Sequence, residues 1–326
     1  MKKIKDKKRI GILRGGTEGD YDSSLREGGE IILHIFENLS ERWKVVDIFI
    51  DKSGVWHMGG VAISPSILPQ KVDLVWNVAH HSMANILQSF SIPTINISSF
   101  SFLLKQDNDI LREHIKELDL NMPKKIVLPL YQADFDARPT GRSFGRGPIE
   151  EYTTRKAREV LGKFPAPWIV RTFTPDSDMG IHLAKTFPEL MSAIKDGVQH
   201  KKSILVEEFI SGKNVSIHSV SGFRGEDVYV FPICTDRSHY NLPNGKASFS
   251  TEEKDQFMQT ARNLHKHLGA EHYLQSNFVL HPKRGIFVTD ISFSQDLKKD
   301  SHLSQSCELV GAKMHHIVEH ILEKAL

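Results

Sequence analysis

The segment from Pro167 to Val220 constrains the fold more than any other part of the chain. An apolar strand over 168–170 is predicted to end on Arg171, and a second strand over 204–206 runs into Glu207 and Glu208. A polar loop and a capped helix are expected between the two strands. This layout suits the binding of a nucleotide: the cation and the backbone amides of the loop face phosphates, and the end of the second strand faces a base and a sugar.

Composition places the chain among ordinary globular proteins. Its 326 residues predict two or three domains, with 40% hydrophobic and 25% charged residues. The formal charge of +2 gives no reason to expect nucleic acid as a partner. The one charge run, over residues 2–9, is expected to be a solvated tail, with an anionic partner as the minor alternative.

The cysteine and histidine patterns exclude common metal and redox motifs. Cys234 and Cys307 lie far apart and have no zinc or redox spacing, which favours a reducing cytoplasm. The apolar run 10–13 is too short for a signal peptide, and no segment approaches the ~18 apolar residues of a membrane span, so no membrane partner is expected. Histidines such as His265 and His267 lack a carboxylate-backed metal pattern and are expected to have surface or packing roles.

The first hundred residues alternate strands and helices. Strands are predicted over 9–13, 45–50, 72–78 and 92–96, and Ser23 or Ser24 is a candidate N-cap for the first helix. This order indicates a parallel sheet with helices on both faces. Ligands of such sheets bind at the carboxyl ends of the strands, where residues 15–17 and 77–81 fall.

The middle of the chain changes character. A helix is expected over 102–118, and a loop or flexible insertion over 131–160, where Gly, Pro and unpaired arginines are dense. The insertion suits an exposed linker or a lid that supplies an arginine to an anion. Capping boxes at 186–189 and 250–253 open two later helices, and Gly269 suits the C-terminal cap of the second. The last helix is predicted over 307–326.

A hairpin near the C-terminus is predicted to gather polar side chains. A four-residue loop over 282–285 places Asn277 opposite Asp290 and Gln275 opposite Ser292, all on one face, with Phe278, Phe287 and Ile291 on the other. This patch is either a solvent face or an oxygen-rich site. Magnesium prefers carboxylates, waters and phosphates, and only Asp290 is anionic here.

Several of these segments resemble the D-alanine–D-alanine ligases of the ATP-grasp superfamily, over nearly the whole chain. The matching stretches are 10–17 (IGILRGGT), 72–80 (VDLVWNVAH), 92–94, 169–171, 177–180, 204–212 (ILVEEFISG) and 268–294. The resemblance implies an α/β and α+β fold with three domains. These are an N-terminal parallel α/β domain (1–100), a small central domain (101–212) and a C-terminal mixed-sheet domain (213–326).

The resemblance also implies an ATP-dependent carboxylate–amine ligase that works through an acylphosphate, with small amino-acid-like substrates and a possible homodimer. The implied catalytic positions are Asp20, His80 and Gln275. The implied nucleotide positions are Arg171, Ser177, Glu207, Glu208, Ile210 and Asn214, and the implied Mg²⁺ positions are Asn277, Asp290 and Ser292.

Several matching positions depart from the family pattern. Asn277, Asp290 and Ser292 stand where an aspartate, a glutamate and an asparagine bind magnesium, and Gln275 stands for a basic residue. Arg171 replaces a phosphate lysine, and Asn214 a ribose-binding glutamate. These losses make a second hypothesis, a ligase-like fold that binds a nucleotide or a partner without turnover. Each candidate residue also has a purely structural interpretation. His80 could pack at the end of its strand, and Asp20 could be a turn residue. Arg171 could form a surface ion pair, and Glu207 and Glu208 could form an exposed strand end.

Overall fold

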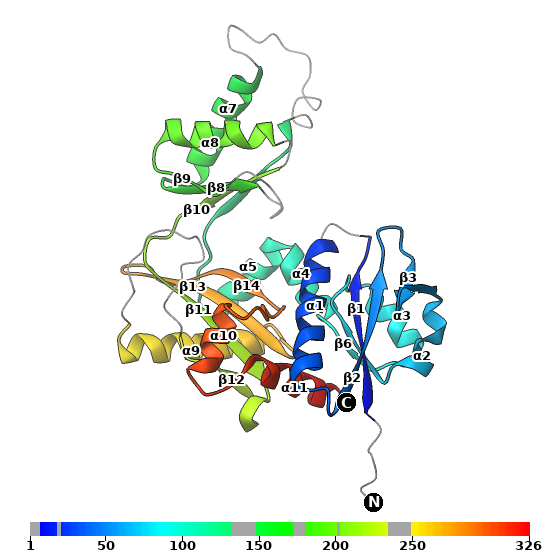
Figure 1. The fold of residues 1–326 in the computed structure, drawn as a ribbon. Helices are drawn as coiled ribbons and strands as arrows, with labels where there is room; N and C mark the ends of the chain where they lie inside the picture. The colour runs from blue at the N-terminus through cyan, green and yellow to red at the C-terminus, as the bar shows by residue number, and fades with distance from the viewer. Residues whose placement is uncertain (1–6, 18–20, 132–147, 173–179, 201–202, 234–248) are drawn as a thin grey trace, which may run out of the picture.

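The fold is known from a computed structural model, which describes residues 7–17, 21–131, 148–172, 180–200, 203–233 and 249–326. The candidate residues Asp20 and Ser177 lie outside these ranges. The described residues form three β-sheets with helices packed on them, which confirms the expected α/β and α+β class (Figure 1).

The first sheet has the strand order β4-β3-β2-β1-β5-β6. Its strands are β1 (Lys8–Gly15), β2 (Trp43–Ile50), β3 (Trp56–Met58), β4 (Val61–Ile63), β5 (Leu74–Asn77) and β6 (Thr94–Ile95). Pairing is parallel among β2, β1, β5 and β6, as predicted, and antiparallel for β3 and β4. Its helices are α1 (Tyr21–Asn38), α2 (Leu68–Lys71) with the short η1 (Pro65–Ile67), and α3 (Met83–Ser89).

The predicted N-cap of α1 is wrong, because the helix already includes Tyr21 and Ser24 lies inside it. The buried Ser24 hydroxyl instead accepts a hydrogen bond of 2.9 Å from the backbone N–H of Gly15. The side chain therefore ties α1 to the carboxyl end of β1.

The second sheet has the order β7-β10-β8-β9, and all its neighbours are antiparallel. Its strands are β7 (Lys125–Leu128), β8 (Trp168–Thr172), β9 (His182–Ala184) and β10 (Ile204–Glu208). Helices α7 (Pro148–Lys163) and α8 (Phe187–Gln199) share one apolar core with it. Helix α7 corrects the insertion expected over 131–160: from Pro148 onward the stretch is helical, because Tyr152, Ala157 and Val160 bury a stripe against this sheet.

The third sheet has the order β12-β11-β13-β14, again antiparallel throughout. Its strands are β11 (Lys213–Ser221), β12 (Val228–Val230), β13 (Tyr273–His281) and β14 (Gly285–Ser292), with the short η2 (Phe223–Gly225) before β12. Helix α9 (Thr251–His267) covers one face. Its predicted capping box at Ser250 and Glu253 is confirmed, and Gly269 has the expected left-handed φ of 60°.

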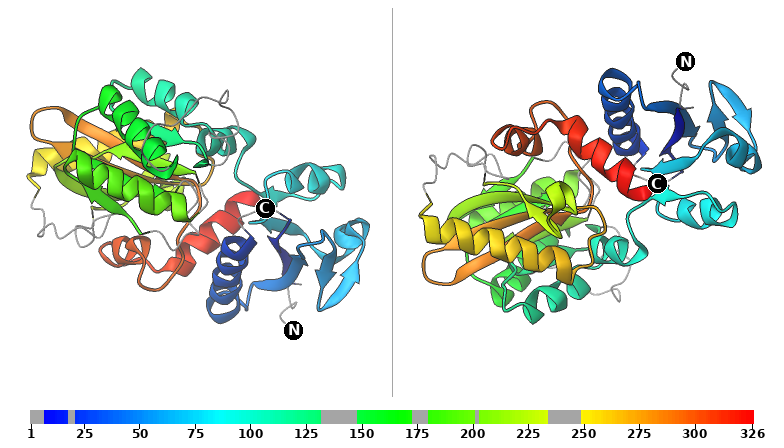
Figure 2. Two further views of the ribbon diagram at one scale, coloured as in Figure 1. Left: turned by 90° about the horizontal axis from the view of Figure 1, so that it is seen from above. Right: turned by 90° about the horizontal axis from the view of Figure 1, so that it is seen from below.

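Two helices predicted as single are each broken in two. The helix expected over 102–118 is α4 (Ser99–Gln106) and α5 (Asn108–Glu117), because the Asp107 side chain caps α5 by accepting from Asp109 and Ile110. Both pack into the core shared with α9. The helix expected over 307–326 is also interrupted: residues 307 and 308 end α10 (His302–Glu308), and α11 (Met314–Ala325) begins only at Met314. Helix α11 lies between the first and third sheets, as Figure 2 shows, and joins them in one apolar cluster.

The hairpin of β13 and β14 differs from the predicted register at its tip. His281 pairs with Gly285, so the loop has three residues, 282–284. From this pair to Phe278–Val288, each residue of β13 pairs with the residue one position before its predicted partner on β14. A bulge at Thr289 then restores the predicted pairs Asn277–Asp290 and Gln275–Ser292. The prediction that Phe287 points away from these residues is therefore wrong, because the bulge reverses the alternation between Phe287 and Asp290.

Within the part of the chain that the structure describes, no helix combines the length and the apolar character needed to cross a membrane.

Candidate functional site

The face of the third sheet opposite α9 carries three rows of cross-strand neighbours. They are His218–Gln275–Ser292, Ser216–Asn277–Asp290 and Asn214–Val279–Phe287. Directly opposed residues of an antiparallel sheet share a face. The predicted grouping of Gln275, Asn277, Asp290 and Ser292 on one face is confirmed. Ser216 and His218 belong to the same surface, which sequence reasoning missed because it considered only one hairpin.

The donors of this surface do not fit a protein-built magnesium site. Asn277 is 3% exposed, and its side-chain oxygen accepts hydrogen bonds from Ser216 and, at 3.3 Å, from Gln275. The Ser292 hydroxyl donates to the carbonyl of Ser294 at 3.1 Å. Two of the three positions implied for metal are thus neutral and engaged within the protein. Asp290 is exposed and supplies the one carboxylate of the three rows.

His218 forms the buried end of the first row. Its Nδ1 lies 2.7 Å from the hydroxyl of Tyr273, and Nε2 has no hydrogen-bond partner among the described residues. Burial, assisted by the nearby His302, lowers the pKa of His218 to about 3. The imidazole is therefore neutral at physiological pH and acts as a polar, uncharged support beside Gln275.

The face of the second sheet opposite α7 and α8 carries a triad of charges. Glu207 is 2% exposed and lies 3.0 Å from Lys125 and 3.0 Å from Arg171. The alternative of an exposed strand end is wrong for Glu207, because the two cations cover it. Burial disfavours its ionisation, yet the combined attraction of Lys125 and Arg171 holds the pKa of Glu207 below its usual range. The triad keeps one net positive charge.

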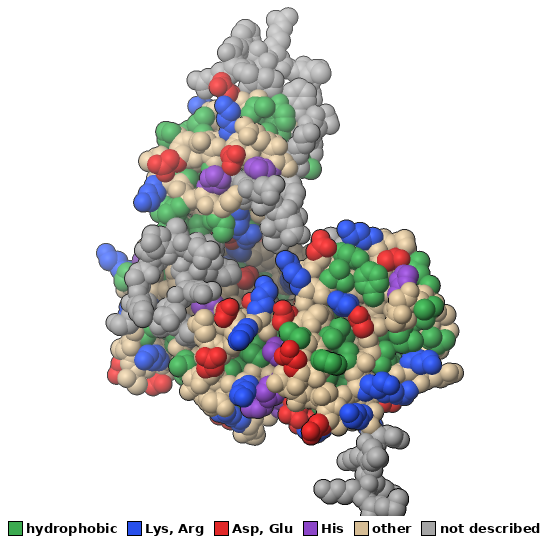
Figure 3. Space-filling model, viewed as in Figure 1, with side chains coloured by type: hydrophobic (Ala, Val, Ile, Leu, Met, Phe, Trp, Pro, Cys, Tyr) green, Lys and Arg blue, Asp and Glu red, His purple; other side chains and the backbone are tan. Residues whose placement is uncertain are grey.

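The second and third sheets meet at the tip of the hairpin. Glu208 lies 2.6 Å from Arg284 and accepts from the backbone N–H of Lys124 at 3.2 Å. Ile210 forms a small buried cluster with Val279 and Phe287, the two residues that share a row with Asn214. An apolar wall therefore borders the polar rows on one side. The space-filling view shows a recess between the upper part, built on the second sheet, and the rest of the molecule (Figure 3).

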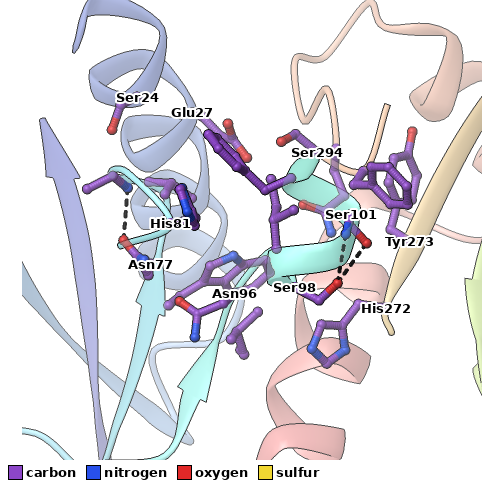
Figure 4. Close-up of a pocket in the computed structure, with 18 of the residues that line it drawn as sticks. Ser24, Glu27, Asn77, His81, Asn96, Ser98, Ser101, His272, Tyr273 and Ser294 are labelled. Atoms are coloured by element: carbon purple, nitrogen blue, oxygen red, sulfur yellow. Dashed lines mark hydrogen bonds between the residues drawn. The ribbon is translucent and has the colours of Figure 1, made fainter. Parts of the chain in front are cut away.

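A pocket of about 110 Å³ lies between the first and third sheets (Figure 4). Ser24 and Glu27 of α1 lie on one side, and Tyr273 and Ser294 on the other. His80 and Lys105 also line it. Its polar lining comes from three segments far apart in sequence, so this site could not be assembled from one motif.

Two adjacent histidines shape the pocket. His80 Nδ1 lies 2.8 Å from the Ser82 hydroxyl, and His81 stacks on Phe102 with ring centroids 3.6 Å apart. Burial and the neighbouring His80 lower the pKa of His81. The structure thus brings the predicted His80 to the pocket wall. Sequence reasoning did not single out His81 and Phe102, although their position after β5 was a signal.

A second cavity adjoins this pocket and borders the polar rows. It shares Ser23, Glu27, Ser294 and Gln295 with the first pocket and is also lined by Gln275 and Ser292. The two cavities are therefore neighbours, the first reaching His80 and the second reaching the third sheet. A small molecule in the first pocket would lie next to whatever binds the polar rows.

Comparisons with known proteins agree with this geometry. The family described as D-ala D-ala ligase C-terminus matches residues 142–323. The D-alanine–D-alanine ligase of Oceanobacillus iheyensis is 20% identical, covering 98% of this chain and 95% of that protein. The corresponding ligase of Carboxydothermus hydrogenoformans is 21% identical, covering 96% of this chain and 97% of that protein.

Solved structures show the same fold. VanG D-Ala:D-Ser ligase from Enterococcus faecalis superposes with a TM-score of 0.67 at 15% identity, covering 98% of this chain and all (100%) of that one. A D-alanine–D-alanine ligase from Bacillus anthracis, solved with ATP, gives a TM-score of 0.63 at 16% identity, covering 98% of this chain and 97% of that one. The sequence family matched over more than half of the chain, together with this fold, shows that the protein belongs to the D-alanine–D-alanine ligase family of ATP-grasp proteins.

Proposed function

We propose that the protein is an ATP-dependent carboxylate–amine ligase that joins two small amino-acid-like molecules. The observation that carries this proposal is that the pocket at His80 and Glu27 adjoins the cavity lined by Gln275 and Ser292. A ligase of this kind needs its acid and its phosphate donor in adjacent compartments. The family membership supports the same reaction class.

The nucleotide is proposed to lie between the second and third sheets. Arg171 and Lys125 carry the positive charge that a triphosphate needs, and the cluster of Ile210, Val279 and Phe287 offers an apolar surface for a base. Glu208 and Asn214 lie beside that cluster. Magnesium is proposed to arrive bound to the nucleotide, with Asp290 as its carboxylate contact, since the engaged Asn277 and Ser292 do not supply a built site.

In the proposed reaction, a substrate carboxylate oxygen attacks the γ-phosphorus, and ADP leaves. The amine of the second substrate then attacks the acylphosphate carbon, loses a proton and expels phosphate. In the pocket, Glu27 is proposed to face a substrate ammonium group and Lys105 a carboxylate, while His80 orients the first substrate. Gln275 is proposed to donate a hydrogen bond to the tetrahedral intermediate, which a neutral amide stabilises less than a cation would.

The test is release of ADP and phosphate from Mg-ATP with a panel of D- and L-amino acids and hydroxy acids. We expect release that requires a substrate pair and a ligated product in the mass spectrum. Absence of release above background with every pair would overturn the proposal.

A second candidate is a ligase-like protein that binds nucleotide, or a partner, without turnover. The specific observation in its favour is that Gln275, Asn277 and Ser292 are all neutral and hydrogen-bonded within the protein. Under this alternative, Mg-ATP raises the melting temperature but no amino-acid pair causes ADP release. An unchanged melting temperature at saturating Mg-ATP would argue against both candidates.

Several expectations from the sequence stay predictions. They are the roles of Asp20 and Ser177, the domain boundaries at 100 and 212, the cytoplasmic location, the homodimer and the lack of nucleic-acid binding.

A further inference from the structure

A cluster of three potential metal ligands lies outside the proposed active site. His114 and Glu117 belong to α5, and His267 is the last residue of α9. The three ligand atoms all lie within 4.8 Å of one another. Because residues three apart share a helix face, His114 and Glu117 point to the same side of α5. From this geometry we propose a binding site for one divalent transition-metal ion, with Zn²⁺ as the best-fitting ion.

The distances match the edges of a coordination tetrahedron. His114 Nδ1 lies 3.2 Å from His267 Nε2, and the Glu117 carboxylate lies 3.3 Å from His267 Nε2 and 3.7 Å from His114 Nδ1. Ligands bound at ~2.0–2.1 Å in tetrahedral geometry are about 3.3–3.4 Å apart. A cation at the centre of these atoms therefore requires movements of a few tenths of an ångström.

The helix ends provide a second reason for a cation here. Glu117 is the last residue of α5, and His267 is the last residue of α9. The carboxyl end of a helix carries partial negative charge, so two such ends together with one carboxylate favour a positive ion. The sequence alone hid this site, because the carboxylate that accompanies His267 comes from a position 150 residues earlier, on another helix.

The two helices are held in place independently of any ion. Leu111 and Ile115 of α5 belong to the same apolar cluster as Leu264 of α9. The ligands therefore project from a shared core, and little order is lost when an ion binds. The imidazoles are about a quarter exposed, at 28% and 25%, whereas Glu117 is 62% exposed, which leaves room for a water as fourth ligand.

The chemistry of the donors decides the class of ion. Two imidazoles and a carboxylate suit Zn²⁺, Co²⁺ or Ni²⁺, whereas Mg²⁺ and Ca²⁺ prefer oxygen donors. The competing explanation is a hydrogen-bonded group in which one imidazole donates to the other and Glu117 accepts. The metal site and the hydrogen-bonded group both fit the distances among the three ligand atoms, so a metal titration is needed to distinguish them.

The experiment titrates chelator-treated full-length protein with Zn²⁺ in competition with a chromophoric chelator, and with Co²⁺ while recording visible absorption. We expect one ion per chain and the intense visible bands of tetrahedral Co²⁺. His267→Gln is expected to weaken Zn²⁺ binding ~100-fold or more, since changes even to groups that only support a ligand cost 10–100-fold. Glu117→Gln, which keeps the size of the side chain, is expected to weaken it to a smaller degree.

A matched control lies elsewhere on the surface. His200→Gln removes a histidine 3.9 Å from Asp196, in a group that does not bring three ligand atoms together, and should leave Zn²⁺ affinity unchanged. Circular dichroism would verify that each variant folds. Zn²⁺ affinity that is equal in the wild type, His267→Gln and Glu117→Gln would overturn the proposal, as would a Co²⁺ spectrum of octahedral type. Because the titration uses neither ATP nor amino acids, its outcome is independent of the proposed ligase activity.

Discussion

Glu207 is the residue whose replacement tests the architecture of the second sheet most directly. Its carboxylate is 2% exposed and is held by Lys125 and Arg171, each at 3.0 Å. Glu207→Gln keeps the size of the side chain and one hydrogen-bond acceptor but removes the negative charge. The two cations are then left beside each other on a largely buried face.

The expected loss of stability follows from the burial of the three partners. Removing one member of a buried ion pair costs about 3–5 kcal/mol. The side chains of Lys125 and Arg171 keep 17% and 32% exposure, so water relieves part of their repulsion. We therefore expect Glu207→Gln to lower the free energy of unfolding of the second sheet by about 2–3 kcal/mol at pH 7.

The effect should depend on pH in a defined direction. The pKa of Glu207 is lowered in the folded protein, so its contribution is present above the unfolded-state pKa of about 4.3 and is lost as the pH falls through the folded-state value. The difference between wild type and Glu207→Gln should accordingly shrink below pH 4.

Hydrogen exchange of the backbone amides in β8 and β10, measured with urea titrations, reports the local free energy of unfolding. The control is Glu319→Gln, whose partner Arg42 is 54% exposed, and it should cost about 1 kcal/mol or less. The reasoning would be refuted if the free energy of unfolding of Glu207→Gln lay within about 0.5 kcal/mol of the wild-type value at a pH where Glu319→Gln also leaves it unchanged.

Three further outcomes are expected. Asp290→Asn should reduce ligase turnover by about 10²–10³, since this exposed side chain is the carboxylate of the polar rows; unaltered turnover of the folded variant would contradict that role. His218 and His265 are buried, which lowers their pKa values to about 3 and about 4, so the unfolded chain takes up protons that the folded protein does not; these two residues alone should make the free energy of unfolding fall as the pH drops below about 6.5, by about 2.7 kcal/mol per pH unit at most, and a flat profile between pH 7 and 5 in urea titrations would contradict this. Gly212→Ala should destabilise the protein in thermal scans, because its Cβ would lie 2.2 Å from the Leu280 carbonyl oxygen, whereas Gly162→Ala meets no atom and should stabilise α7 by about 0.5–1 kcal/mol; the opposite order would be inconsistent with the packing.

The polar rows show what a local pattern can predict. Alternation along the hairpin was enough to place Gln275, Asn277, Asp290 and Ser292 on one face. The bulge at Thr289 was not predictable, because an extra residue in a strand leaves no compositional mark. The predicted pairs were correct only because the three-residue loop and the bulge offset each other.

Long-range partners account for most of what sequence reasoning missed. Arg171 was predicted to end its strand, whereas β8 ends one residue later, at Thr172. Lys125 of β7, the second cation beside Glu207, was not predicted, since the pairing of β7 with β10 joins residues about 80 positions apart. Likewise, the break between α4 and α5 was not predicted. It depends on one side chain, that of Asp107, which caps the start of α5 and so interrupts the helix that the sequence pattern would continue.

The position of α11 decides which parts of the molecule share a core. Its Ile317 and Ile321 share a core with Ile31 and Ile35 of α1 and with strands of the third sheet, so these two parts behave as one solid block. Among the described residues, the core of the second sheet is built from positions between 126 and 206. A change in the width of the recess is therefore expected to move this smaller unit as one body relative to the rest, with the ion pair of Glu208 and Arg284 at their border.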